Sequence, residues 1–494
     1  MRKRFEQKLT FRTRPIADVN LNFKSRDELP PILMALQYIF VTPELNERVF
    51  EILERDVFPA NKKNVGRKGM DLWHILVLGV VRHAMGTNWD KLHYMANSDE
   101  YIRSIMGVYQ TAFADGEKIE FNYQTILDNV SHLNEDTLLE INQVIVEAGY
   151  SILKKKEEEV LRLKTDSYAV EANVHFPTDL NLLWDSIRKC LDLIKALKEE
   201  LPAIKGWRKL KYLRQQIKTT FRATSFQVFK GKNEDKKKEA VKGYLDQSYY
   251  LIDKVNTLLA DETLALTPKA AAIMQALILF RDYAVKLNDQ IERRLLNDET
   301  IPASEKIYSI FEPHTEWLSK GKLNKRVELG HLLLVTTDQH QFIVDYKLMV
   351  DERDPAQVPS LIERLEKNLG NKTIDSISFD KGFYSKENLE ALQGSKIKQI
   401  ILPKKGKKNK EETAKEAATD FVKLRHKHSA VESNINMLEH HGLGRCMDKG
   451  LNGFRRYVGL SVLAYNLHVL GNVLTKKQQE AAIKKQKAAF RKAA

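Results

Sequence analysis

The sequence predicts an α/β protein in which a mixed sheet flanked by helices follows an all-helical region and is interrupted by a long helical insertion. Three observations predict this class. Residues before 160 show helical periodicity only, and the first alternating segment starts there. Helical periodicity then fills residues 180–297. After residue 326, β-rich segments return and alternate with helical ones, which is typical of a sheet covered by helices.

The composition is that of a large globular protein with an excess of positive charge. The chain has 494 residues, enough for roughly three domains of ordinary size. Hydrophobic residues make up 43% and charged residues 30%, which is ordinary for a chain that buries real cores. There are 80 Lys and Arg against 66 Asp and Glu, a net charge of +14 that favours a polyanionic partner.

Two further features of the sequence bear on where the chain works. Cys190 and Cys446 are its two cysteines, which cannot build a disulfide framework, so a reducing compartment is expected. No apolar run approaches about 18 residues, so we expect no membrane span.

Residues 1–160 are predicted to form a helical N-terminal domain. Thr42 and Pro43 have the pattern of a helix cap followed by proline at the first helical position. A second strong helix is expected over residues 70–84, MDLWHILVLGVVRHA. Short helices broken by tight turns fit a helix-turn-helix DNA reader and also a plain bundle. No basic recognition helix stands out, which favours the bundle; binding of DNA ends or dimerisation is its expected role.

The first predicted strand carries an aspartate at or near its end. In LRLKTDSYAV, residues 161–170, apolar and polar side chains alternate up to Thr165, and Asp166 follows. Pro177, Thr178 and Asp179 mark a turn and a helix start. An aspartate at a strand end is most often a turn or cap residue, so Asp166 alone is weak evidence for catalysis.

Residues 180–297 are predicted to form a helical insertion, because they contain no convincing strand and strand signals resume after them. Four long helical patterns follow one another. The second pattern is strongly basic, and a solvated face and a DNA contact both fit it. Its cations are Arg208, Lys209, Lys211, Arg214, Lys218 and Arg222.

The returning strands begin with a hairpin. Residues 326–337 and 341–350 are β-rich and joined by a short turn. A helix ended by Gly370 follows, then a short strand with Asp380 at its end and a helix capped by Ser385. IKQIILPKK is the next strand. Residues 404–420 are expected to be a charged, solvated loop.

The segment from Lys423 to Asn436 is predicted to be one helix with two distinct faces. Gly442 is predicted to end this helix. A carboxylate among basic and amide groups on one face could hold a metal ion and meet a phosphate, although a solvated face has the same pattern. The apolar stripe consists of Phe421, Leu424, Val431, Ile435 and Leu438. The opposite face carries Arg425, Ser429, Glu432 and Asn436.

The element order indicates a ribonuclease-H-like catalytic domain, formed by residues 161–179 and 298–475. In that arrangement a carboxylate on the first strand lies beside one on the fourth, and a third comes from the last helix. Asp166, Asp380 and Glu432 occupy these positions. Three carboxylates suit two divalent cations about 3.5–4 Å apart, which serve in-line phosphoryl displacement.

Three segments together resemble the DDE transposases of bacterial insertion sequences, and the ISNCY family in particular. They are LKTDSYAVEANVHFPTD, SFDKGFYSKEN and the stretch from SAVESNINMLEHHGLGRC to NLHVLG. The resemblance covers nearly the whole chain. It implies that Asp166, Asp380 and Glu432 are the catalytic and metal-binding triad, with two Mg²⁺ or Mn²⁺ ions.

The resemblance also implies partners and a reaction. The protein would bind double-stranded DNA at terminal inverted repeats, hydrolyse a phosphodiester there and join the freed 3′-hydroxyl to target DNA. We expect a homodimer on DNA in the bacterial cytoplasm, at the nucleoid, and no membrane contact. Candidates for phosphate contacts are Lys320, Lys322, Arg425, His428, Asn436 and Arg445.

Three further expectations remain. His426, His428, His440 and His441 gather in sequence, but paired cysteines and a closed ligand spacing are missing, so zinc is not expected. Residues 476–494 are expected to be a frayed basic tail that adds non-specific DNA affinity. Two other functions fit the same chain: a non-catalytic DNA-binding protein on a transposase scaffold, and a ribonuclease-H-like nuclease acting on RNA hybrids or junctions.

Overall fold

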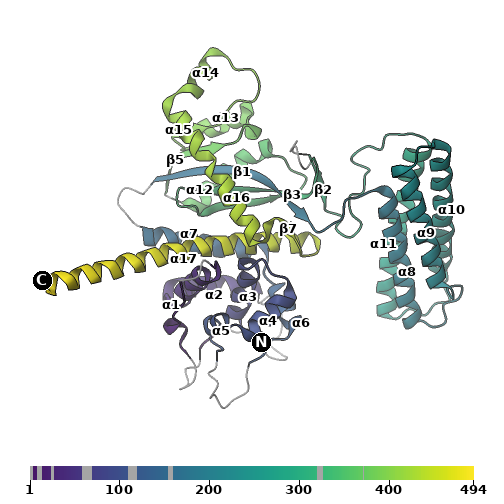
Figure 1. The fold of residues 1–494 in the computed structure, drawn as a ribbon, viewed down its shortest axis with the longest axis horizontal. Coiled ribbons are helices and arrows are strands. Elements are labelled where there is room, and N and C mark those ends of the chain that lie inside the picture. The colour runs from purple at the N-terminus through teal and green to yellow at the C-terminus, as the bar shows by residue number, and fades with distance from the viewer. Residues whose placement is uncertain are drawn as a thin grey trace. The chain divides into compact units, whose positions relative to one another are not determined.

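The computed structural model describes residues 4–7, 14–23, 27–57, 69–109, 119–153, 160–319, 326–370 and 372–493. The chain divides into two compact units. The first unit contains residues 1–173 and 318–494, and the second contains residues 174–317. The predicted N-terminal helices and the sheet therefore belong to the same unit, whereas the helical insertion lies in the other (Figure 1).

The described elements that precede the sheet are all helical. Helix α3 is buried at every position, which explains its apolar sequence on all sides and leaves it no face for a DNA groove. After a short 3₁₀ turn at Ile16–Asp18, the helices are α1 Leu29–Val41, α2 Pro43–Val57, α3 Leu72–Ala84, α4 Trp89–Ser98, α5 Glu100–Ile105, α6 Tyr123–Val130 and α7 Glu135–Leu153.

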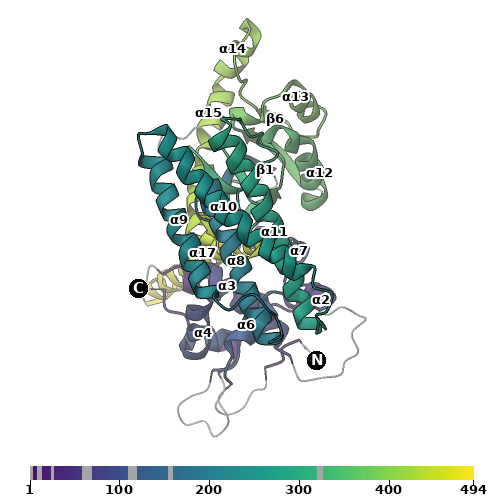
Figure 2. The same cartoon turned by 90° about the vertical axis from the view of Figure 1, so that its right-hand side faces the viewer.

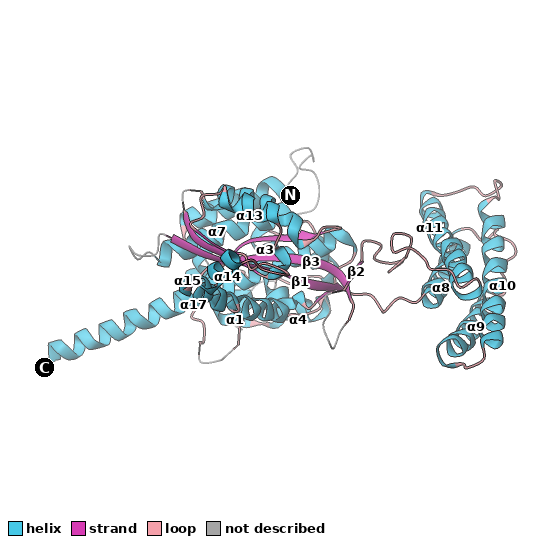
Figure 3. Ribbon diagram, turned by 90° about the horizontal axis from the view of Figure 1, so that it is seen from above, coloured by secondary structure: helices cyan, strands magenta, loops and turns pink. Residues whose placement is uncertain are grey.

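The sheet is mixed, as predicted. Strand β1 is antiparallel to β3 and parallel to β5; β3 is antiparallel to β4, and β5 is parallel to β6. This gives the order β4-β3-β1-β5-β6, with β2 also beside β3 and β7 beside β1. Figure 3 shows the strands in magenta, with β1 next to β3. The strands are β1 Val160–Ala172, β2 Glu316–Leu318, β3 Glu328–Thr337, β4 Ile343–Met349, β5 Thr373–Phe379, β6 Gln399–Ile401 and β7 Arg445–Cys446.

Helices follow and cover these strands. Gly370 has φ +56°, the left-handed region that favours glycine, and it ends α12 as predicted. The helices are α12 Val358–Leu369, α13 Lys386–Gln393, α14 Lys410–Ala417, α15 Thr419–His428, α16 Ala430–Leu438 and α17 Gly450–Ala493. Three shorter turns are η3 Asp354–Gln357, η4 Lys381–Phe383 and the π-helical η5 Glu439–Leu443.

The prediction of a charged loop over residues 404–420 was wrong, because α14 lies within it. Asn409 and Glu412 form a capping box at its start. The Lys404 ammonium bonds both oxygens of Glu412, and the Lys408 ammonium bonds Glu416. The charges that indicated a solvated loop therefore pair with one another across this helix and the segment before it.

Helices cover both faces of the sheet. Successive residues of a strand point to opposite faces. On one face, α16 reaches Thr337 of β3 through a hydrogen bond from Asn434. On the other face, Asp345 of β4 accepts hydrogen bonds from Arg364 of α12 at 2.8–3.2 Å. Thr337 is the register partner of Lys164, so α16 lies on the face that carries Lys164 and Asp166.

Helices α7 and α17 lie side by side along the edge of the sheet near β4 (Figure 1). Asn466 of α17 bonds both Asn142 of α7 and the backbone of Ile343. The segment Gly450–Gln486 of α17 is long and apolar enough to cross a membrane, but 72% of its most apolar window is buried inside the protein, as in a core helix. The helix continues to Ala493, so the expected fraying from residue 476 is not observed.

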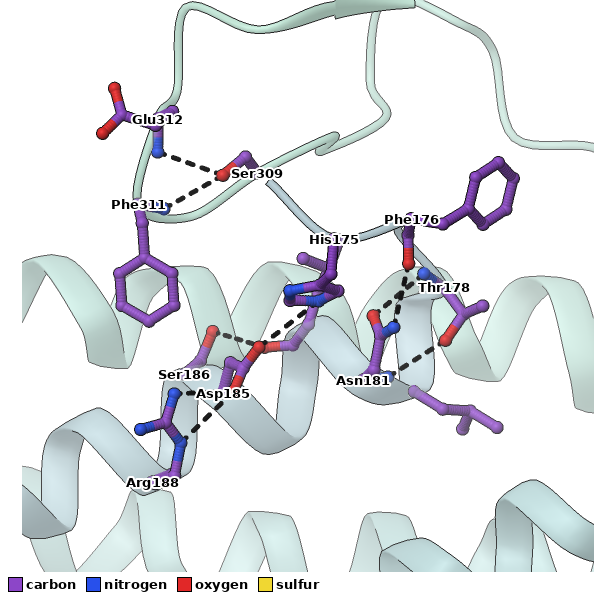
Figure 4. A network of polar contacts seen from close by, with 12 residues as sticks. His175, Phe176, Thr178, Asn181, Asp185, Ser186, Arg188, Ser309, Phe311 and Glu312 are labelled. Carbon is purple, nitrogen blue, oxygen red and sulfur yellow. Dashed lines mark hydrogen bonds and ion pairs between the residues drawn. The ribbon is translucent and has the colours of Figure 1, made fainter. Parts of the chain in front are cut away.

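The second unit is a bundle of four long helices (Figure 2). Helix α8 begins with a capping box in which Thr178 and Asn181 bond each other's backbone (Figure 4). Asp185, one turn further, bonds Arg188 and lies 3.4 Å from His175. The helices are α8 Asp179–Glu200, α9 Leu210–Lys230, α10 Glu234–Leu259 and α11 Pro268–Ile291, followed by the π-helical turn Glu292–Leu296.

Candidate active site

The first two predicted carboxylates lie on β1 and directly after its parallel neighbour β5. Asp166 was predicted at or near the end of its strand, and this was wrong, because β1 continues to Ala172. Thr165 of β1 is the register partner of Phe379, the last residue of β5, and Asp166 and Asp380 are the residues that follow them. Because neighbouring strands lie about 4.7–4.9 Å apart, the two aspartates follow neighbouring points of the sheet. Asp166 is half-buried, and its Oδ1 accepts a hydrogen bond of 2.7 Å from the Ser167 amide, whereas Asp380 is exposed.

Hydrogen bonds hold the turn that follows β5. Asp380 directly precedes the short turn η4, where the amide of Phe383 bonds the Asp380 carbonyl. The buried side chain of Asn388 donates to the carbonyls of Phe383 and Pro355 at 2.8 and 2.7 Å. Ser385 caps α13, as predicted, by accepting from the Asn388 amide. These bonds hold the backbone that carries Asp380 while its carboxylate stays exposed.

Glu432 stands in the first turn of α16. The prediction of one continuous helix was wrong in detail, because α15 and α16 meet at Ser429 and the Glu432 amide bonds the Ser429 carbonyl. The predicted apolar stripe still faces inward on both helices, with Phe421, Val431 and Leu438 buried and Leu424 and Ile435 half-buried. The Asn434 side chain, 2% exposed, donates to the Thr337 hydroxyl at 3.1 Å and anchors α16 to β3. Glu432 itself is exposed.

His428 connects the three elements. Its Nδ1 lies 3.0 Å from the hydroxyl of Ser378 on β5, and that hydroxyl also contacts the Leu163 carbonyl of β1. Burial lowers the pKa of the His428 imidazole; the carboxylates of Asp380 and Glu432 oppose this shift, and the Lys164 ammonium adds to it. The imidazole therefore interacts electrostatically with two of the three predicted carboxylates.

The donor set fits hard divalent cations, which take oxygen ligands. Among the described residues, the three carboxylates do not form a group whose ligand atoms all lie within 4.8 Å of one another. Larger distances between the carboxylate oxygens are compatible with two ions about 3.5–4 Å apart, each bound by some of the three carboxylates. Asp380 and Glu432 are exposed, so ions and a phosphate have access to them.

The other predicted site residues divide into three groups. Asn436 is exposed on α16, the helix of Glu432, and Arg425 is exposed on the preceding α15, 4.0 Å from Glu416. Arg445 lies on β7, beside Glu171 at the far end of β1, so the structure does not bring it to the carboxylates. Lys320 and Lys322 lie outside the described residues.

Sequence reasoning missed Lys164. It lies two residues before Asp166 and thus on the same face of β1, and burial lowers the pKa of its ammonium, with Asp338 opposing the shift. The alternation in LRLKTD could have identified it, because a cation in register with an aspartate is a natural phosphate contact. Ser378 and Asn434 had no such signal, since their roles depend on residues far along the chain.

A mixed sheet of this order, with one aspartate within a central strand and another directly after its parallel neighbour, is typical of the ribonuclease-H-like class. Residues 295–467 match the family model of the transposase DDE domain. The matched residues include Asp380 and Glu432, whereas Asp166 precedes them. The match supports a DDE transposase, an enzyme that cuts and transfers DNA, and proteins with this domain generally use divalent metal ions. No curated protein and no solved structure matches the chain.

Proposed function

We propose that the protein is the transposase of a bacterial insertion sequence of the ISNCY type. It hydrolyses phosphodiesters at the element's ends and joins the 3′-hydroxyls to target DNA, and Asp166, Asp380 and Glu432 are its catalytic triad. The observation that supports this most directly is the register of β1 and β5, in which the residues directly before Asp166 and Asp380 are partners, in a chain whose residues 295–467 match a transposase domain.

Each residue of the site has a distinct role in the proposed reaction. Asp166, Asp380 and Glu432 would hold two Mg²⁺ or Mn²⁺ ions, which stabilise the attacking and leaving oxygens of an in-line displacement. The Ser167 amide orients the Asp166 carboxylate. His428, at the end of α15 and 3.0 Å from Ser378, holds the junction of α15 with α16, the helix of Glu432, against β5. Lys164 supplies positive charge on the same face for the scissile phosphate.

The test of this function is a cleavage assay on duplexes that carry the DNA flanking the reading frame. We expect strand cleavage at the element's ends that needs Mg²⁺ or Mn²⁺ and stops on chelation. RNA–DNA hybrids and branched junctions of the same sequence serve as competitors. Preferential cleavage of hybrids or junctions would favour a ribonuclease-H-like nuclease, and tight binding without any cleavage would favour a non-catalytic DNA-binding protein.

His428 gives a first prediction for this site. His428→Ala is expected to lower the cleavage rate by roughly 10-fold or more, because the junction that leads into the helix of Glu432 loses its bond to Ser378, while affinity for DNA changes little. Single-turnover cleavage and a gel-shift titration separate the two effects. His426→Ala, on the exposed face of α15, is the matched control and should alter neither. A loss of binding equal to the loss of cleavage would make His428 a DNA contact instead.

We propose that the second unit contacts the DNA backbone through a basic cleft beside α9. The cleft has a volume of about 760 Å³. Tyr212 and Tyr250 line it together with five cations. One of these, Lys254, bonds the Gly206 carbonyl and lies 4.9 Å from the ring of Trp207. Cations interleaved with aromatic rings suit a nucleic-acid strand. The cationic residues are Lys198, Lys205, Arg208, Lys209 and Lys254.

This cleft gives a second prediction. Replacing Lys205, Arg208 and Lys209 by Gln should weaken binding to DNA of any sequence, because each lost phosphate contact lowers the slope of log affinity against log salt by about 0.9. Fluorescence anisotropy over a salt series measures that slope. The matched control replaces three exposed lysines outside the cleft: Lys236, Lys242 and Lys286. Equal slopes for the two triple variants would exclude the cleft as a DNA contact.

Assembly and location complete the proposal. The strand-transfer reaction joins two element ends, so we infer a homodimer on DNA, acting in the bacterial cytoplasm at the nucleoid. Both cysteines, Cys190 and Cys446, are buried and free, as a reducing compartment allows.

A further inference from the structure

A second group of metal-ligating side chains lies away from the three carboxylates. Glu28 stands at the N-cap position of α1, His441 lies in η5 and His468 lies in α17. One ligand atom from each lies within 4.8 Å of the others. Three elements that are far apart in sequence thus place two imidazoles and one carboxylate around a single point.

The distances within this group suit an ion with nitrogen ligands. Nδ1 of His468 lies 3.4 Å from Nε2 of His441, and Oε2 of Glu28 lies 3.7 Å from the other ring nitrogen of His441, Nδ1. A single ion shared by the two imidazoles would therefore take Nε2 of His441. Two nitrogens that each bind Zn²⁺ at about 2.0–2.1 Å in a tetrahedral site are about 3.4 Å apart. A long N···N contact is a poor hydrogen bond, so the spacing of the imidazoles is explained better by a shared ion than by a direct bond.

The surroundings of the two imidazoles favour the neutral form of the ring. The His441 side chain is completely buried, and His468 is half-buried. Burial lowers the pKa of His441 to about 4 and also lowers the pKa of His468. Neutral imidazoles are the form that binds metals.

We propose that Glu28, His441 and His468 form a site for a divalent transition metal of the zinc type, which ties the end of the helix that carries Glu432 to α1 and α17. Two imidazoles and a carboxylate favour Zn²⁺ over Mg²⁺, which takes oxygen ligands. Because η5 continues α16 directly, an ion bound there holds the base of the Glu432 helix. This site is distinct from the three carboxylates, and its binding does not depend on the proposed transposase activity.

The binding experiment uses the full chain with Asp166→Asn and Asp380→Asn, so that the carboxylate site takes up no ion. After removal of metals by chelation, Zn²⁺ is titrated against a chromogenic chelator, and Co²⁺ is added as a spectroscopic probe. We expect one Zn²⁺ per chain and the visible absorption of tetrahedral Co²⁺. His468→Ala should weaken Zn²⁺ binding by roughly 10-fold or more and remove the Co²⁺ absorption.

Two further variants keep this test decisive. Glu28→Gln preserves shape at a half-exposed position, so it should fold normally and still lose the rise in thermal midpoint that Zn²⁺ gives the parent protein. His440→Ala, at the exposed neighbouring histidine, should bind Zn²⁺ as the parent does. Unchanged Zn²⁺ affinity in His468→Ala and Glu28→Gln, or no Zn²⁺ binding by the parent, would overturn the site and leave the histidines as core aromatic residues.

Discussion

Asp380→Asn is expected to abolish metal-dependent cleavage of element-end DNA while DNA binding persists. The carboxylate is exposed and makes no capping bond within η4, so the amide leaves the fold intact and removes one anionic ligand. Metal ions contribute several kcal/mol of transition-state stabilisation, and 1.36 kcal/mol corresponds to tenfold in rate. A loss of about 10³-fold or more is therefore expected in single-turnover cleavage with Mg²⁺.

The matched control is Asp375→Asn. Asp375 lies on the same strand, β5, and pairs with the exposed Arg162 at 3.5 Å instead of facing the proposed site. Its cleavage rate should stay close to that of the unsubstituted protein. If Asp380→Asn cleaved DNA as fast as this control, the assignment of Asp380, and with it the proposed triad, would have to be abandoned.

The second large effect is expected on stability, at a buried ionic cluster. Asp448 accepts from Arg82 at 2.7 Å and from Arg456 at 3.3 Å, and the side chains of Asp448 and Arg82 are 4% and 2% exposed. The Arg82 guanidinium also lies 3.8 Å from the ring centre of Trp89. Asp448→Ala leaves two guanidinium groups without their anion, so we expect a loss of about 3–5 kcal/mol in the free energy of unfolding.

Urea denaturation followed by tryptophan fluorescence measures this change, because Trp89 stacks on Arg82. The control is Asp128→Asn, at an exposed aspartate that accepts a hydrogen bond from Gln124, and a change within about 0.5 kcal/mol is expected there. Equal midpoints for the two variants would mean that Asp448 does not stabilise the arginines. The cluster joins α3 to the start of α17, so its loss should loosen the N-terminal helices first.

Local sequence patterns predicted the order of the main strands and helices along the chain. Alternation identified β1 and the β3–β4 hairpin, and the cap and stop residues Ser385 and Gly370 end their helices where expected. These features depend on the chain's nearest neighbours, so a single sequence reveals them. Helix α14 was missed because its charges were taken as solvated, although Lys, Glu and Ala are strong helix formers and Asn409 with Glu412 has the spacing of a capping box.

Other features depend on residues that meet only after folding. His428 was predicted to contact DNA, and its bond to Ser378 and its interaction with Asp380 have no local signature. The sequence analysis did not predict a zinc site at the histidines of the Lys423–Cys446 stretch, because their spacing does not match that of zinc ligands. The structure instead gathers His441 with Glu28 and His468, which come from the two ends of the chain.

By itself the sequence determined most of the strands and helices and their order along the chain, and it predicted three carboxylates as a catalytic triad. It could do so because periodicity and capping act over a few residues. Only the tertiary structure decided which side chains lie beside each of those acids and which buried groups come together elsewhere. Such contacts join residues hundreds of positions apart, where burial and packing, and no local pattern, select the partner.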